Sequence, residues 1–294
     1  MHNAHTRIDG RAPVSGVQHP ALRYHGGKFA AANWLLGMLP AHRVYVEPFG
    51  GAAGLLLRKP ISEVEVYNDR DDEIVGFFEV LRDREKRAAL CEALALTPYA
   101  RREFERAYTA APVADPVERA RRVVIRAQMG FGSAGATKGR TGWRTYCGVK
   151  NPHIEWRNAP DAIRAAGERF ERVIIECRDA FELIAAHDAA DVLHFVDPPY
   201  VPDTRCTRAS SQTYRHELDA EQHGRLVELL LSVEGAVLLC GYPTEIYAPL
   251  ERAGWRREER QARASGRRGG VMRTEAVWLN PRASARAKQM RLIA

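Results

Sequence analysis

The stretch that decides the fold is Val192-Leu193-His194-Phe195-Val196-Asp197-Pro198-Pro199-Tyr200. Its first five residues are mostly apolar and partly β-branched, which is typical of a strand buried in a sheet. The two prolines after Asp197 fix φ and lack an N–H donor, so they predict a stiff turn where the strand ends. A carboxylate and a tyrosine ring are therefore expected beyond the carboxyl end of a strand, where open α/β sheets bind ligands.

Four other short apolar runs have the same character, at residues 44–46, 64–67, 173–175 and 236–239. Helical patterns fall between them, one over residues 28–39 and one that opens with a capping box, Asp219 with Gln222. Strands alternating with helices predict an α/β fold with a mixed, mostly parallel sheet. We assign this catalytic domain to residues 21–81 and 171–280, between a flexible lead-in at 1–20 and a basic tail at 281–294.

Residues 82–170 interrupt this alternation of predicted strands and helices. They are mainly helical in pattern and then rich in glycine, and they hold 18 Lys and Arg against 10 Asp and Glu. The whole chain has a formal net charge of +7, so the positive charge is concentrated in this segment. A basic insertion suits a polyanionic partner, and we predict an inserted, mainly helical domain that binds nucleic acid.

Composition narrows the class of protein further. No apolar run approaches the roughly 18 residues that span a bilayer, so we expect no membrane role. The five cysteines are scattered and never form a CxxC pair, which favours reduced thiols in the cytoplasm over a disulfide framework or a metal site.

A second motif, Glu47-Pro48-Phe49-Gly50-Gly51-Ala52-Ala53-Gly54, directly follows the predicted strand at 44–46. A strand, a glycine-rich turn and a helix form a nucleotide-type cradle, because glycines allow close approach and a helix N-terminus offers free N–H groups. Asp69 ends the next predicted strand, where an acidic residue can accept hydrogen bonds from ribose hydroxyls. The alternative for Asp69 is a helix N-cap or a solvated turn.

The turn at Asp197 suggests its own chemistry. An amino group on an aromatic ring is a poor nucleophile because its lone pair is delocalised. Two acceptors facing its hydrogens, the Asp197 carboxylate and the Pro198 carbonyl, favour its pyramidal form as it attacks the methyl group of a sulfonium donor. Tyr200 supplies a ring on which a flipped base can stack. The alternative is a proline-rich loop in which the aspartate only shapes a turn.

Together with Tyr24-His25-Gly26-Gly27-Lys28, these motifs resemble the Dam-type family of N6-adenine DNA methyltransferases, including phage and prophage members. The resemblance covers roughly residues 22–280. It lies in the order of the elements: the aromatic-x-Gly-Gly-Lys segment, the glycine-rich loop, Asp69, the insertion and Asp-Pro-Pro-Tyr.

This resemblance implies a Rossmann-like enzyme that uses S-adenosylmethionine and needs no metal. It places Asp197, Pro198 and Tyr200 at the catalytic centre. The residues that it implies for the cofactor are Tyr24, Lys28, Glu47, Phe49, Gly50, Gly51, Gly54, Asp69, Asp179 and Asp197. One departure is alanine where a middle glycine is common in the loop, a conservative change.

Double-stranded DNA is the expected partner, and the segment around residues 131–146 is the expected contact. It places basic side chains beside rings that can stack or wedge. The DNA-binding candidates are Phe131, Lys138, Arg140, Trp143 and Arg144. Either arginine could read a guanine edge, or the segment could touch phosphates alone.

Three alternatives stay open at this stage. The chain could methylate cytosine N4 in DNA or adenine in RNA, although cytosine-N4 enzymes usually carry serine at the position of Asp197. It could also be a non-catalytic nucleic-acid-binding protein of the same fold. We expect a monomer, and a cognate restriction enzyme is a possible partner.

Overall fold

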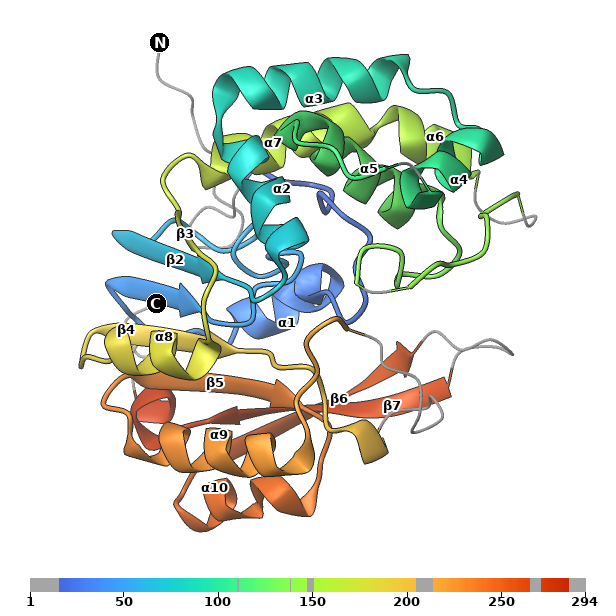
Figure 1. Ribbon diagram of the computed structural model, residues 1–294. Helices are drawn as coiled ribbons and strands as arrows, with labels where there is room; N and C mark the ends of the chain where they lie inside the picture. The colour runs from blue at the N-terminus through green and yellow to red at the C-terminus, as the bar shows by residue number, and fades with distance from the viewer. Residues whose placement is uncertain are drawn as a thin grey trace.

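The computed structural model describes residues 16–109, 111–137, 139–146, 151–204, 214–264 and 271–285 (Figure 1). Its strands form one seven-stranded sheet in the order β3-β2-β1-β4-β5-β7-β6. The strands are β1 (Val44–Glu47), β2 (Val64–Asn68), β3 (Ile174–Glu176), β4 (Val192–Val196), β5 (Ala236–Gly241), β6 (Arg256–Ala264) and β7 (Val271–Leu279). The five strands predicted from apolar runs are β1 to β5, and all five are confirmed within two residues at either end.

The sheet is parallel from β3 to β5 and antiparallel at β7. In register, Val46 lies beside Val66 of β2 and His194 of β4, which makes β1 and β4 the central pair. From β1 the chain adds β2 and then β3 toward one edge of the sheet, and from β4 it adds β5 toward the other edge. The strand order therefore reverses between β1 and β4, and such a reversal opens a crevice at the carboxyl ends of the two strands.

Helices cover both faces of the sheet (Figure 1). The upper layer in that view contains α1 (Ala32–Leu36), α2 (Asp72–Arg82), α3 (Arg84–Leu96), α4 (Arg101–Thr109), α5 (Pro116–Met129), α6 (Pro152–Arg157) and α7 (Ala159–Phe170). The lower layer contains α8 (Ala180–Ala186), α9 (Ala220–Ser232) and α10 (Ala248–Arg252). Alternate strand residues supply the two cores. Tyr67 packs under the upper layer and Val66 under the lower one, as the two-residue period of a strand requires.

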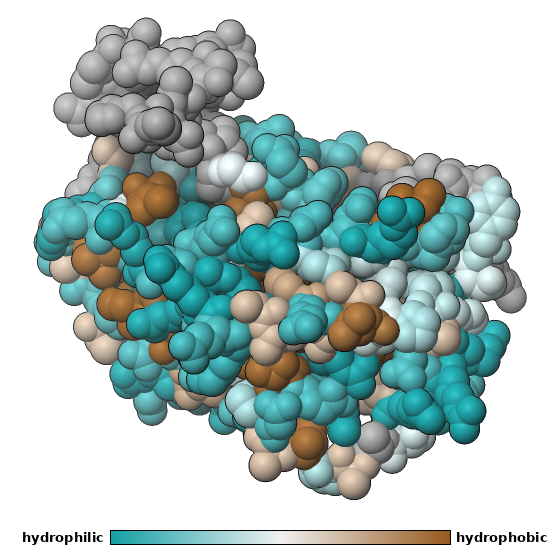
Figure 2. All heavy atoms as spheres, turned by 90° about the horizontal axis from the view of Figure 1, so that it is seen from above, coloured by the Kyte–Doolittle hydropathy of each residue, from teal (hydrophilic) through white to brown (hydrophobic). Residues whose placement is uncertain are grey.

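The basic segment at residues 82–170 does not have a core of its own. Val123 of α5 and Phe170 of α7 belong to the same buried cluster as Tyr45 and Leu193 of the sheet. The helices of this segment therefore pack on one face of the sheet, and a separate inserted domain stays a prediction. Figure 2 looks down on this layer and shows a mostly hydrophilic surface with separate apolar spots.

Two expectations about local structure were wrong. The segment after the glycine-rich loop is a series of turns over residues 51–58, not a helix, and both Gly51 and Ala53 have left-handed φ, at +48° and +52°. Those conformations interrupt a right-handed helix. The helix expected over residues 28–39 is shorter, a 3-10 turn at Lys28–Ala31 followed by α1.

The hairpin β6–β7 forms one edge of the main sheet, and neither of its strands was predicted from the sequence. β6 begins with five consecutive charged residues and has no apolar run, so it lacks the pattern of a buried strand. β7 pairs with β5 through Leu239 and Trp278, which joins the hairpin to the core. The capping box predicted at Asp219 and Gln222 is confirmed at the start of α9.

Within the described residues no helix is long and apolar enough to cross a membrane. Lys138, the lead-in up to residue 15 and the tail from residue 286 lie outside the described residues.

Candidate active site

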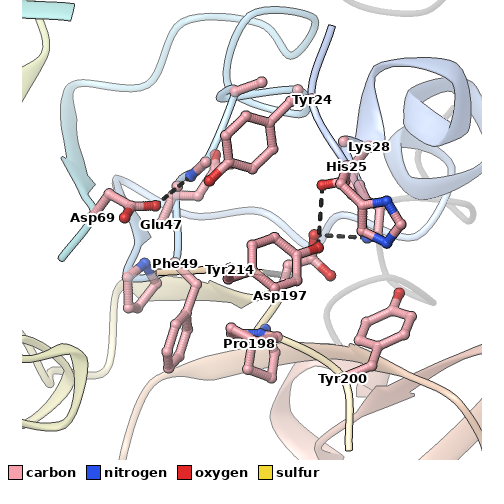
Figure 3. A pocket seen from close by; sticks show the side chains of 18 of the residues that line it. Tyr24, His25, Lys28, Glu47, Phe49, Asp69, Asp197, Pro198, Tyr200 and Tyr214 are labelled. Carbon is pink, nitrogen blue, oxygen red and sulfur yellow. Dashed lines mark hydrogen bonds and ion pairs between the residues drawn. The ribbon is translucent and has the colours of Figure 1, made fainter. Parts of the chain in front are cut away.

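A cavity of about 670 Å³ opens at the carboxyl ends of β1, β2 and β4. Its walls bring together the loop after β1, the turn after β4 and the segment around Tyr24, which come from distant parts of the chain (Figure 3). The reversal of strand order between β1 and β4 lies at this place. The crevice expected from the topology is thus present as a cavity at the carboxyl ends of these strands.

The glycine-rich loop is held tightly against its surroundings. A Cβ on Gly54 would lie 2.5 Å from the backbone nitrogen of Phe29, and a Cβ on Gly51 would lie 2.8 Å from the ring of Tyr24. Tyr67 donates a hydrogen bond from its hydroxyl to the Gly51 carbonyl at 2.7 Å. Side chains at these two positions would push the loop off the segment around Tyr24, so close approach requires glycine at both, and at Gly51 the left-handed φ favours it as well.

Asp69, at the end of β2, has two backbone partners. Oδ2 accepts from the Gly51 N–H at 2.8 Å and Oδ1 accepts from the Asp71 N–H at 2.8 Å (Figure 3). Burial raises the pKa of Asp69, and the two N–H donors oppose that rise. Each carboxylate oxygen has a second lone pair, so Asp69 can hold the loop and still accept a hydrogen bond from a ligand. The N-cap of α2 is Asp71, not Asp69.

Asp197 and Lys28 form a buried ion pair at the centre of the cavity. Lys28 Nζ lies 2.7 Å from Asp197 Oδ2, and the two side chains are 8% and 15% exposed. Nζ also donates to the Gly26 carbonyl at 2.8 Å. Asp197 Oδ1 is buried and has no hydrogen-bond partner among the described residues. One oxygen of the carboxylate is therefore neutralised and the other is available to a ligand.

Burial raises the pKa of Asp197, and the charge of Lys28 opposes that rise. Burial lowers the pKa of Lys28, but the negative charge of Asp197, together with Tyr200, Cys240 and Glu275, raises it by more, so that pKa lies well above its ordinary value. The raised pKa of Lys28 favours its charged form, whereas the carboxylate form of Asp197 is disfavoured by burial and favoured by the charge of Lys28.

Two tyrosine rings stand beside this pair. Tyr200 lies 4.7 Å from Tyr242 between ring centroids, at an interplanar angle of 74°, and Lys28 Nζ lies 5.0 Å from the Tyr200 centroid. Tyr242 follows β5 and lines the cavity with Glu275 of β7. The cavity thus continues past Asp197 into an aromatic end, opposite the end that holds Asp69.

Glu47 lies buried at the carboxyl end of β1 and lines the cavity. Tyr45 donates its hydroxyl hydrogen to Glu47 Oε2 at 2.7 Å. Burial raises the pKa of Glu47 to about 8, the hydrogen bond from Tyr45 opposes the rise and the charge of Asp197 adds to it. The cavity floor therefore contains a carboxyl group that titrates near neutral pH.

The remaining cofactor candidates also line the cavity, namely Phe49, Gly50, Tyr24 and Asp179. Asp179 is the N-cap of α8, where Oδ1 accepts from the Phe181 N–H at 2.8 Å, and it lies 3.5 Å from Arg70. Its local role is to start a helix, although it faces the cavity. The structure thus brings every one of the predicted cofactor and catalytic residues to one cavity.

The predicted DNA-binding residues divide into two groups. Phe131 is 63% exposed and Arg140 is exposed. Trp143 packs on Tyr99 at 4.7 Å between centroids, and Arg144 is 11% exposed with Nη1 2.7 Å from Glu155. Trp143 and Arg144 therefore make internal contacts, so the structure favours only the first group as a DNA surface.

Two features of the cavity were missed in the sequence. Arg215 pairs with Asp71 at 2.6 Å and also with Glu73, which joins the loop before α9 to the start of α2. Tyr214 donates its hydroxyl hydrogen to the His25 carbonyl at 3.1 Å (Figure 3). Neither contact was predicted, because each depends on the fold that brings residues over 140 positions apart together.

The fold and the site define a class, a Rossmann-like enzyme with a nucleotide-type cavity and an acidic, aromatic turn at its centre. The family model of D12 class N6 adenine-specific DNA methyltransferases matches residues 24–238, and the chain belongs to this family. A search of curated proteins gave no match.

The family defines the activity as transfer of a methyl group to N6 of adenine in DNA, with S-adenosylmethionine as the donor that such enzymes generally use. The cytosine-N4, RNA and non-catalytic alternatives are therefore set aside. Among the described residues no group of His, Cys, Asp and Glu could hold a metal ion.

Proposed function

We propose that the cavity binds S-adenosylmethionine at its Asp69 end and a flipped adenine at its Tyr200 end, with Asp197 between them. The observation that carries this proposal is the difference between the two carboxylate oxygens of Asp197. Lys28 holds Oδ2, while Oδ1 is buried without a partner in the described part of the chain. A buried polar atom without a partner is costly, and an amino hydrogen of adenine would satisfy it.

The residues present fit the cofactor. A cavity of about 670 Å³ lies within the range of roughly 300–1,000 Å³ that is usual for small-molecule sites. Gly51 and Gly54 leave two positions of the loop along one wall without a side chain. Asp69 would hold the ribose hydroxyls, and Phe49 and Asp179 would line the nucleoside. Bound there, S-adenosylmethionine supplies the methyl group as an electrophilic sulfonium.

The chain's own groups would act on the amino group of the base. Asp197 Oδ1 and the Pro198 carbonyl would each accept one amino hydrogen, which returns lone-pair density to nitrogen. Lys28 keeps Asp197 charged and fixes its orientation. Tyr200 would stack on the base, and its neighbour Tyr242 holds that ring at a steep angle. Orientation and exclusion of water would then supply most of the rate enhancement.

Phe131 and Arg140 support duplex DNA as the form of the substrate. Phe131 is an exposed ring on the segment that also places Ser133 in the cavity wall, so it stands near the opening. A ring in that place can fill the gap left by a flipped base. Arg140 offers a phosphate contact beside it. We infer that a monomer acts in the cytoplasm in this way, with or without a cognate restriction enzyme.

A methyl-transfer assay tests the proposal. The protein is incubated with S-adenosylmethionine labelled in its methyl group and with mixed-sequence duplex DNA, and the modified base is identified after digestion. Label in N6-methyladenine is expected, and loss of that label in Asp197→Asn, with cofactor binding retained, assigns the reaction to this cavity. Transfer by Asp197→Asn at the wild-type rate would remove Asp197 from the reaction. Methylation-sensitive long-read sequencing of DNA from expressing cells then gives the recognition site.

A further inference from the structure

Behind the Asp197 turn, on the side away from the cavity, lies a fully buried histidine. His223 stands in the first turn of α9, and its relative exposure is 0%. Nε2 lies 3.0 Å from the Pro199 carbonyl oxygen, and Nδ1 lies 2.9 Å from the Tyr247 hydroxyl. A chain of two hydrogen bonds therefore runs from Tyr247 through the imidazole to the backbone of the turn.

The partners determine which nitrogen carries the hydrogen. A carbonyl oxygen only accepts, so Nε2 must carry the hydrogen and donate it to Pro199. Nδ1 of the neutral ring then accepts from Tyr247. Burial raises the pKa of Tyr247, so its hydroxyl keeps the hydrogen that it donates. The neutral imidazole is thus held as one tautomer, because the Pro199 carbonyl can only accept.

Tyr247 is itself fixed by packing. Its ring meets that of Trp278 on β7 at 4.9 Å between centroids and 62°. A Cβ on Gly241 would lie 2.9 Å from the Tyr247 ring, so the end of β5 is shaped to receive it. The chain of hydrogen bonds accordingly ends in the core of the lower layer and not in solvent.

We propose that His223 is a positioning residue that sets the orientation of the Asp197-Pro198-Pro199-Tyr200 turn for methyl transfer. The inference rests on the proposed function of that turn. Both prolines have φ fixed by their rings, so the freedom left to the turn lies mainly in ψ. Anchoring the Pro199 carbonyl fixes ψ of Pro199 and the plane of the peptide that leads to Tyr200.

The turn is then held from two sides. Lys28 holds the Asp197 carboxylate within the cavity, and His223 holds the Pro199 carbonyl from the helical layer. Neither contact alone fixes both the acceptor and the stacking ring. Since a misplacement of about 1 Å can lower a rate roughly 100-fold, release of the carbonyl is expected to act on the chemical step.

The test uses four variants of the full chain. His223→Leu removes both hydrogen bonds and keeps an apolar side chain in the core. His223→Gln keeps an N–H donor near the place of Nε2, whereas the shorter amide of His223→Asn cannot reach Pro199. Leu230→Ala is the matched control, because Leu230 is a buried residue of the same helix and core without a polar group.

We expect His223→Leu to lower the single-turnover rate constant for methyl transfer roughly 10- to 100-fold. The Kd for S-adenosylmethionine and the Kd for DNA are expected to change less than about threefold. His223→Gln is expected to recover most of the rate and His223→Asn to recover little. Leu230→Ala is expected to lower Tm and leave kcat near that of the wild type. This split between kcat and binding, with rescue by glutamine alone, is not expected of a residue that only stabilises the core.

Three results would overturn the inference: wild-type kcat in His223→Leu, equal rates in the glutamine and asparagine variants, or an equal loss of kcat in Leu230→Ala. If His223→Leu does not fold, the comparison of His223→Gln with His223→Asn decides the question. Asp197→Asn is measured in parallel. If it retains turnover, the proposed function fails, whereas an inactive Asp197→Asn beside a fully active His223→Leu overturns only the role of His223.

Discussion

The ammonium group of Lys28 lies 2.7 Å from Oδ2 of Asp197, and the pair is almost wholly buried. The two residues are 169 positions apart, and the fold joins them because the 3-10 turn at Lys28–Ala31 and the turn after β4 meet at the same edge of the sheet. The pair affects the charge of the carboxylate on which the proposed reaction depends. Its effect can therefore be measured in the pH dependence of the reaction rate.

Lys28→Met is expected to move the acid limb of the rate profile to higher pH. Burial raises the pKa of Asp197 and Lys28 lowers it, so removing the cation raises that pKa further. The reaction needs the carboxylate as an acceptor, and protonation at a higher pH therefore stops it at a higher pH. The single-turnover rate constant, measured across a range of pH, checks this shift. Lys86→Met, at an exposed lysine, is the control and leaves the profile unchanged.

Asp197→Asn is expected to lower kcat by roughly 10²- to 10⁴-fold, the range typical of a lost proton-accepting group. The amide keeps the shape of the carboxyl group but presents two hydrogens and one oxygen, so it cannot accept at both atoms. Binding of DNA, measured by fluorescence anisotropy, is expected to stay within a few-fold of the wild type. A large loss of DNA affinity would instead indicate that the turn had moved.

The raised pKa of Glu47 leads us to expect that cofactor binding depends on pH. Its pKa is raised to about 8 by burial, so at pH 7 most of the protein carries it protonated. The sulfonium of S-adenosylmethionine is a cation and favours the charged carboxylate. Affinity for it is therefore expected to rise with pH through about 8 and to level off above.

Titration calorimetry checks this dependence and offers a matched ligand. S-adenosylhomocysteine has the same nucleoside and amino acid but a neutral sulfur, so its affinity is expected to change much less over the same range. Glu47→Gln is expected to remove the difference between the two ligands. Equal pH dependence for both ligands in the wild-type protein would contradict a role for Glu47 in recognising the charge.

The strands and the centre of the site follow from local sequence, and the contacts across the fold do not. The runs that became β1 to β5 are short and apolar, and Asp197 directly follows one of them, so its place was predictable. The edge strands were not, because β6 buries few apolar side chains and depends on pairing with β7. The turns after Gly50 were also mistaken for a helix, since the left-handed φ of Ala53 is not visible in an alanine.

The same distinction applies to the cavity. Glycines and acidic residues at strand ends predicted its floor correctly, because the carboxyl ends of parallel strands meet at one edge. The pairs Lys28–Asp197 and His223–Pro199 join residues from different elements, and no spacing in the sequence encodes them. Partners of that kind emerge only when the elements are packed together.

The two arginines of the segment at residues 139–146 provide the last prediction, a contrast in how DNA affinity is lost. Arg140 is exposed, with its guanidinium 5.9 Å from the Tyr108 ring, whereas Arg144 is largely buried against Glu155. Arg140→Ala is expected to weaken DNA binding uniformly across sequences and to reduce the slope of log K against log salt by about 1, as loss of one phosphate contact does. Arg144→Ala is expected to lower Tm and leave the salt slope unchanged. Affinity measured at several salt concentrations, with thermal unfolding of both variants, separates the two. A changed preference among DNA sequences in Arg144→Ala would show instead that Arg144 leaves Glu155 to read a base.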